Sequence, residues 1–160
     1  MAWDGSRHVY FQDADLVFEG RKITFVGRGY SGVAEQEIDG SDLLVIPGLI
    51  DIHTHLSSEP IRKGITDETV SPGFWHSSLY EHLPVFDPVD DSGRMACLKV
   101  SLSELLLSGV TTVADLSPPF DGWLDALAES GIRAVVAPLF RDARWYTRNG
   151  HALEYEWDEA

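Results

Sequence analysis

Apolar and polar residues alternate with the two-residue period of β-strands along the first part of the chain. Ala14 to Glu19 is an extended run, Gly20-Arg21-Lys22 has the composition of a turn, and Ile23 to Gly27 is a return strand. Glu37-Ile38-Asp39-Gly40 then leads into the next apolar segment. The pattern predicts a small β-rich unit over residues 1–44.

From Val45 onward the pattern predicts strands that alternate with helices. Val45 to His55 is a short apolar strand, and a one-sided helical stripe begins after Asp90, Asp91 or Ser92, any of which could cap the helix. The apolar residues of this stripe recur at spacings of three and four, and they are Met95, Leu98, Leu102, Leu105 and Leu106. Gly109 stands where a glycine would end the helix.

Two more strands and one more helix follow. Val110 to Leu116 is a β-branched strand, Pro118-Pro119 interrupts it, and a helix with Trp123, Leu124 and Leu127 on one face ends at Gly131. Ile132 to Phe140 is a third, almost wholly apolar strand. Strands in this order with helical crossovers indicate a parallel sheet.

A segment rich in proline, glycine and aromatic residues separates the first strand from the first long helix. It runs from His55 to Pro88, and a connection of that length inside a domain is usually functional. Trp75 and Tyr80 are candidates for substrate selection, with solvated loop surface as the default. His76, His82 and His151 lack strand spacing or a partner pattern, so we leave them out of any metal site.

Composition narrows the classes of partner. The 160 residues include 12 basic and 26 acidic residues, for a formal charge of −14. Such a chain repels phosphate and anionic lipid, so we expect neither nucleic-acid nor membrane binding. Cys97 is the only cysteine, which excludes an internal disulfide and suits a reducing compartment. We see no signal peptide and expect a soluble, cytoplasmic protein.

Two histidines end the first of the strands that alternate with helices. The segment Val45-Ile46-Pro47-Gly48-Leu49-Ile50-Asp51-Ile52-His53-Thr54-His55-Leu56 places Asp51, His53 and His55 at every second position. On a regular strand these side chains project to one side, and two neutral imidazoles can share one divalent cation. Paired histidines on a half-buried strand can also be structural, but the flanking Pro47-Gly48 and Asp51 favour the metal interpretation.

This segment resembles the first barrel strand of the amidohydrolase superfamily, whose PG[LF]xDxHxH pattern supplies two metal ligands. The resemblance implies an α/β fold, namely the first three strands of a (β/α)8 TIM barrel over residues 45–160, preceded by part of a small β-sandwich over residues 1–44. It also implies His53 and His55 as ligands of a divalent metal, zinc or alternatively iron. A metal-activated water would then hydrolyse or deaminate a non-peptide C–N bond.

Ser108-Gly109-Val110-Thr111-Thr112-Val113-Ala114-Asp115 resembles the chlorohydrolase and aminohydrolase branch of the superfamily, which acts on heterocyclic amines and related small molecules. In the family, the further ligands and the general base come from strands four, five, six and eight. A complete barrel needs roughly 250 residues. The resemblance therefore implies an N-terminal segment that is inactive alone, has no catalytic base of its own and needs the missing C-terminal barrel portion. The full-length form is expected to include homo-oligomers.

The alternative is a non-catalytic remnant, or one chain of a split enzyme that pairs with a partner. Four other residues are candidates for the second shell or the pocket. Asp51 could orient a histidine or make a contact at the barrel base, and Asp115 could line the pocket or cap the following helix. Glu59 and Arg62 could select substrate or lie on solvated surface.

Overall fold

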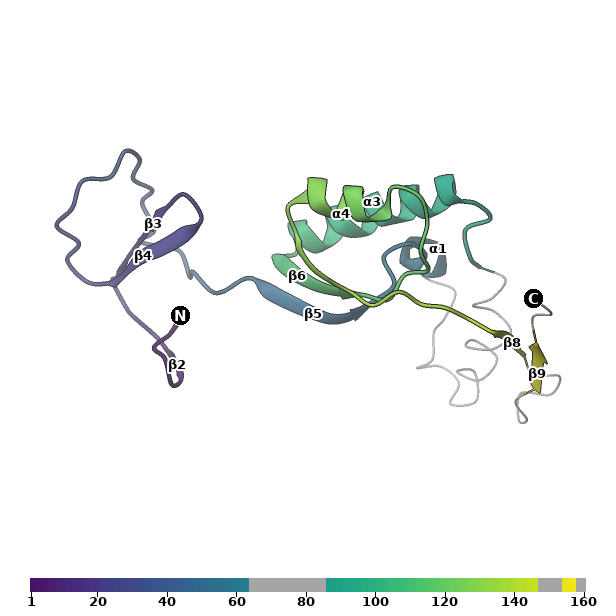
Figure 1. Ribbon diagram of the computed structural model, residues 1–160. Coiled ribbons are helices and arrows are strands. Elements are labelled where there is room, and N and C mark those ends of the chain that lie inside the picture. Colours follow the sequence, from purple (N-terminus) through teal and green to yellow (C-terminus); the bar gives the residue numbers. More distant parts are fainter. Residues whose placement is uncertain (64–85, 147–153, 158–160) are drawn as a thin grey trace. The chain divides into compact units, whose positions relative to one another are not determined.

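The computed structural model of the chain describes residues 1–63, 86–146 and 154–157 (Figure 1). The chain divides into two compact units, residues 1–47 and 48–160. In the part of the chain that the structure describes, no helix is long and apolar enough to cross a membrane. The candidates Trp75 and Tyr80 lie outside the described residues, as do the three histidines left out of the metal site, namely His76, His82 and His151.

The first unit consists of two antiparallel pairs of strands. Strand β1 (Ala2–Trp3) pairs with β2 (His8–Val9), and β3 (Asp15–Glu19) pairs with β4 (Lys22–Gly27). The predicted hairpin around Gly20 is therefore confirmed. The assignment of this unit to part of a β-sandwich stays a prediction.

The second unit is an α/β layer built on a parallel sheet. Its strands are β5 (Leu49–Thr54), β6 (Val110–Asp115) and β7 (Arg133–Val136), in the order β5-β6-β7. Helices α3 (Asp91–Leu107) and α4 (Trp123–Ser130) lie over one face of this sheet (Figure 1). The short helix α1 (Glu59–Arg62) follows β5 directly. The mixed α/β class and the parallel order are thus confirmed.

Residues after β7 form a separate antiparallel hairpin that the sequence did not let us place. Strand β8 (Ala143–Tyr146) pairs with β9 (Glu154–Trp157).

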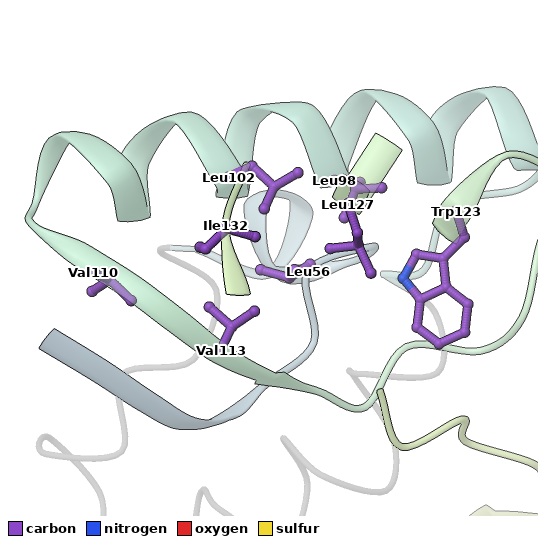
Figure 2. Close-up of a cluster of buried hydrophobic side chains, with 8 residues drawn as sticks. All are labelled: Leu56, Leu98, Leu102, Val110, Val113, Trp123, Leu127 and Ile132. Atoms are coloured by element: carbon purple, nitrogen blue, oxygen red, sulfur yellow. The ribbon is translucent and has the colours of Figure 1, made fainter. Parts of the chain in front are cut away.

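A compact hydrophobic core joins the two long helices to the sheet (Figure 2). Leu56, Leu98 and Val113 are fully buried at its centre. The whole cluster consists of Leu56, Leu98, Leu102, Val110, Val113, Trp123, Leu127 and Ile132. Because α3, α4, β6 and the residue after His55 all contribute, this core fixes the end of β5 against β6.

The helix boundaries follow the expected local signals. The Asp90 carboxylate accepts the main-chain N–H of Gly93 at 2.8 Å and caps α3. Gly109 and Gly131 take left-handed φ angles of 81° and 74° just past α3 and α4. Burial of Cys97 on α3 raises the pKa of its thiol.

Three sequence expectations need correction. The first strand begins at Leu49, not Val45. The third strand ends at Val136, not Phe140. The N–H of Ala137 still donates to the carbonyl of Asp115 at 2.9 Å, but the proline at position 138 lacks an N–H and cannot continue the pairing. Leu124 was expected beside Trp123 and Leu127 but is 58% exposed, because it lies on the outer side of α4.

Candidate metal centre

The two histidines at the end of β5 face each other. The Nε2 atoms of His53 and His55 are 3.3 Å apart, and the two ring centroids are 5.2 Å apart. His53 is exposed and His55 is half-buried. Two zinc-bound nitrogens at about 2.05 Å in tetrahedral geometry are separated by about 3.3 Å. The observed spacing therefore fits two ligands of one cation, although the role itself stays a prediction.

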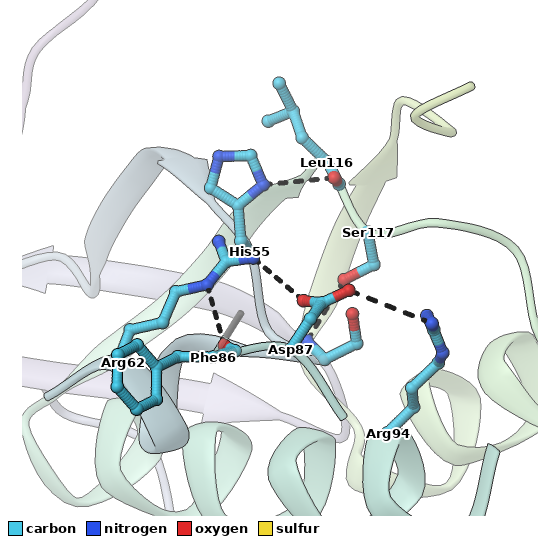
Figure 3. Close-up of polar contacts among 8 residues, drawn as sticks. His55, Arg62, Phe86, Asp87, Arg94, Leu116 and Ser117 are labelled. Atoms are coloured by element: carbon cyan, nitrogen blue, oxygen red, sulfur yellow. Dashed lines mark hydrogen bonds and ion pairs between the residues drawn. The ribbon is translucent and has the colours of Figure 1, made fainter. Parts of the chain in front are cut away.

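A main-chain carbonyl fixes the orientation of His55 (Figure 3). Its Nδ1 lies 3.1 Å from the carbonyl oxygen of Leu116, directly after β6. A carbonyl only accepts, so this contact requires a proton on Nδ1 and leaves Nε2 with a free lone pair. Metal-binding histidines commonly show the same arrangement. With its proton on Nδ1, a neutral His55 can accept a hydrogen bond at Nε2 from Nε2–H of His53.

Asp51 contacts the main chain, not an imidazole ring. Its Oδ1 accepts the N–H of His53 at 3.0 Å. An irregularity in the register between Asp51 and Thr54 also interrupts the strict alternation that we expected, since Asp51 pairs with Val113 and Thr54 pairs with Asp115. The Asp51 carboxylate therefore orients the backbone that carries His53, and it lines the same cavity as both histidines.

A cavity of about 340 Å³ borders the histidines at the edge of β5 that no other described strand pairs with. It is lined by residues of β5, α1, α3 and their flanks, namely Asp51, His53, Thr54, His55, Glu59, Lys63, Ser101, Glu104, Leu105 and Ser108. Lys63 forms an ion pair with Glu104. The carboxylates of Asp51 and Glu59 give the remaining wall an acidic character that favours a cation.

Asp115 lies inside the protein and does not line this cavity. Its side chain is fully buried and accepts hydrogen bonds from Leu56 N at 3.2 Å, Ser117 Oγ at 2.7 Å and Trp123 Nε1 at 2.9 Å. The residue before α4 is Gly122, and no side chain caps that helix. Asp115 therefore neither lines this cavity nor caps α4, and a second-shell role for it stays a prediction.

Arg62 is held in a structural ion pair (Figure 3). Its guanidinium donates to Asp87 Oδ1 at 2.8 Å, and Arg94 approaches the other oxygen of Asp87 at 3.8 Å. This arrangement joins the end of α1 to the start of α3. Of the two candidates for substrate contact, Glu59 lines the cavity and Arg62 does not.

Sequence reasoning missed the groups that hold the histidines in place. The carbonyl of Leu116 carries no signature in its side chain, so no pattern could have identified it. Ser117 and Ser101 are buried serines whose hydroxyls bind the segment after His55. For Ser117, the sequence feature that could have indicated this role is its position two residues after Asp115, the last residue of β6. Among the described residues, no group of three or more histidine, cysteine or acidic side chains could hold a metal ion.

A strand that ends in paired histidines, followed by two further parallel strands with helices over one face, is typical of the class of α/β metal-dependent hydrolases. Residues 44–156 match the family model described as "Amidohydrolase family". The chain belongs to the amidohydrolase family.

Known relatives agree with this assignment. The chain is 31% identical over 134 residues to a 5'-deoxyadenosine deaminase of Methanothrix thermoacetophila, covering 83% of this chain and 31% of that protein. It is 28% identical over 132 residues to a 5-methylthioadenosine/S-adenosylhomocysteine deaminase of Desulfitobacterium hafniense, covering 80% of this chain and 30% of that protein. A solved triazine hydrolase from "Arthobacter aurescens" matches with a TM-score of 0.53 at 30% identity, over 79% of this chain and 30% of that structure. The chain thus spans about a third of the length of these relatives.

Proposed function

We propose that this chain supplies the first two ligands of a divalent-metal site in an amidohydrolase that cleaves a non-peptide C–N bond by hydrolysis or deamination. The observation that carries the proposal is the pair of Nε2 atoms 3.3 Å apart, one of them on a ring whose Nδ1–H is bound by the carbonyl of Leu116. Zinc suits two imidazoles, and iron is the alternative.

In the same proposal, β5, β6 and β7 are the first three strands of a (β/α)8 barrel, and residues 1–44 are part of a β-sandwich. Support comes from the face of the sheet opposite α3 and α4. Ile50, Ile52 and Val135 are 66%, 80% and 62% exposed in the chain as described. Such apolar side chains are buried when a parallel sheet closes on itself.

The residues present have limited tasks in the reaction. His53 and His55 would hold the cation, and the carbonyl of Leu116 keeps Nε2 of His55 free of a proton. Asp51 orients the main chain of His53, and Glu59 lies where it could contact a bound molecule. When bound, the cation would supply a nucleophilic water near neutral pH. The remaining ligands and the general base would come from outside the described residues.

A heterocyclic amine is the substrate class that we propose. Two of the relatives are named as deaminases of adenosine-like compounds, and the third is named as a triazine hydrolase. Adenine and triazine are both nitrogen heterocycles, whose electron-poor ring carbons accept an attacking water. This agrees with the chlorohydrolase and aminohydrolase branch.

Metal binding is tested best by a method that detects weak binding at named rings. Titration of the chain with Co²⁺, a paramagnetic substitute for zinc, should broaden the ring NMR signals of His53 and His55 together. His8 is the matched internal control, because it lies in the first unit. H53A and H55A should each abolish the effect at the other ring, and H8A should not. Unchanged broadening of the residues around the site in the H53A/H55A double variant would refute the site.

Catalysis is tested separately. Ammonia release should be measured with 5'-deoxyadenosine, methylthioadenosine and an amino-triazine, for the chain alone and mixed with a polypeptide carrying the remaining strands. We expect turnover only in the mixture and only with metal. Metal-dependent turnover by the chain alone would contradict the need for further strands.

The alternative is a non-catalytic remnant. A remnant would bind no Co²⁺ at the two histidines and would not be activated by any complementing polypeptide.

A further inference from the structure

We propose that Asp115 is a positioning residue that holds His55 in the tautomer able to bind metal. This inference rests on the proposed function, because it concerns the same histidine. Asp115 itself lies away from the cavity, so it would act through the residues that it binds.

The first step is the pairing of residues 54–57 with residues 115–117. Leu116 N donates to the carbonyl of Thr54 at 2.8 Å, and His55 Nδ1 donates to the carbonyl of Leu116 at 3.1 Å. One residue further, Leu56 N donates to Asp115 Oδ1 at 3.2 Å. The ring contact of His55 therefore lies between two main-chain contacts, and one of these depends on the Asp115 carboxylate.

The second step extends this pairing by one residue. Ser57 N donates to Ser117 Oγ at 3.1 Å, and the hydroxyl of Ser117 donates to Asp115 Oδ1 at 2.7 Å. On the opposite side, Ser101 Oγ of α3 donates to the carbonyl of Leu56 at 3.0 Å. Asp115 thus holds the segment after His55 directly through Leu56 and indirectly through Ser117.

The third step concerns why a carboxylate is required. All three partners of Asp115, namely Leu56 N–H, Ser117 O–H and the indole N–H of Trp123, are donors. An ionised carboxylate accepts all three, whereas an amide must present its NH₂ to one of them. Because Asp115 is fully buried, a donor there that lacks an acceptor cannot bind water instead and lowers the stability of the fold.

The consequence for His55 follows from these contacts. If the segment after His55 shifts, the distance between Nδ1 and the carbonyl of Leu116 lengthens and the proton is no longer held on Nδ1. The imidazole then populates both tautomers, and the form with a proton on Nε2 cannot bind the metal through Nε2.

The experiment compares D115N, W123F and the double variant D115N/W123F in the full chain. The tautomer of His55 is read from its ¹⁵N ring shifts at pH 8 without metal, and Co²⁺ affinity is measured by titration. We expect the wild type to carry its proton on Nδ1. D115N should mix the tautomers and weaken Co²⁺ binding about 2–10-fold, because only the rings that keep the proton on Nδ1 can bind through Nε2. W123F removes the indole N–H that would face the amide NH₂ introduced by D115N. The double variant D115N/W123F should therefore recover most of the Nδ1–H tautomer of His55 and most of the Co²⁺ affinity.

The other results separate this inference from the proposed function. A D115N protein that is less stable but keeps the wild-type tautomer of His55 would overturn the positioning role. An equal loss of Co²⁺ affinity and of the Nδ1–H tautomer in D115N and in D115N/W123F would also overturn it. If D115N does not fold, S117A, which removes the link from Asp115 to Ser57, must shift the tautomer for the inference to stand. A tautomer that depends on Asp115 in a chain that binds no Co²⁺ would support the positioning and refute the metal site.

Discussion

Gly48 is the position at which one added methyl group should disturb the start of the parallel sheet. A Cβ on Gly48 would lie 2.0 Å from Oγ1, 2.5 Å from Cγ2 and 2.8 Å from Cβ of Thr111. Comfortable contacts between non-bonded heavy atoms are about 3.5–4.0 Å. Rotation of the Thr111 side chain does not remove the conflict, because its Cβ is fixed by the backbone of β6. The main chain at Gly48 must therefore move.

Movement at Gly48 weakens the first contacts between β5 and β6. Leu49 N donates to the carbonyl of Gly109 at 2.9 Å, and Leu49 pairs in register with Val110. Overpacking of this kind typically costs about 1–3 kcal/mol. We expect G48A to lower the free energy of unfolding of the second unit by about 1–3 kcal/mol and to speed hydrogen exchange at the Leu49 amide.

The assay is urea unfolding followed by circular dichroism, together with amide exchange at β5. G40A is the matched control, because a Cβ on Gly40 meets no atom within 4 Å. Its effect should stay within about 0.5 kcal/mol. In a T111G background, the G48A penalty should fall to about 0.5 kcal/mol or less, since the conflicting atoms are gone. An equal penalty in both backgrounds would show that the steric argument is wrong.

Three further predictions concern the helices. L98A should lower the free energy of unfolding by about 2–5 kcal/mol, because Leu98 is fully buried. L124A, on the exposed side of α4, should change the free energy of unfolding by less than about 0.5 kcal/mol. Equal effects of the two substitutions would contradict the packing. G131A should cost about 1–2 kcal/mol, since φ there is 74° and the space is open, and G131N should cost less in the same melt. Hydrogen bonds from the main chain of Gly93 and from a neighbouring hydroxyl lower the pKa of Asp90 below its ordinary value of 3.8. The ionised Asp90 therefore stabilises the folded chain above pH 3.8, and this stabilisation is lost as the pH falls through the lowered pKa. The stability difference between wild type and D90A should therefore shrink in acid, and a difference that is constant from pH 7 to pH 2 would refute this.

Regular features of this fold were predictable because their causes are local. The period of the stripe from Met95 to Leu105, the cap at Asp90 and the glycine after each helix are written into adjacent residues, and α3 and α4 form where they indicate. The spacing of His53 and His55 likewise placed the two rings together. Strand order followed from the alternation of strands and helices.

The remaining features depend on partners far along the chain. The three donors of Asp115 come from positions 56, 117 and 123, so its role required the fold that brings them together. The interruption between Asp51 and Thr54 reflects pairing with β6, and alternation along β5 alone could not reveal it. Leu116 acts through its carbonyl, which every residue possesses. In each case the missing information was which segments pair.

If the two histidines bind a cation as proposed, their contacts also indicate from which side further ligands would come. His55 is held from the side of β6 by the carbonyl of Leu116, and the next residue, Leu56, is held by the buried Asp115. On the other side, the edge of β5 has no described partner strand, and the cavity is lined by residues of β5, α1, α3 and their flanks and by none of β6. Two imidazoles leave half of a tetrahedral coordination shell to be filled. Additional ligands would therefore reach the cation along the unpaired edge of β5, where a further barrel strand would also cover Ile50 and Ile52. Completing the metal site and covering the exposed apolar sheet are, on this argument, one physical requirement.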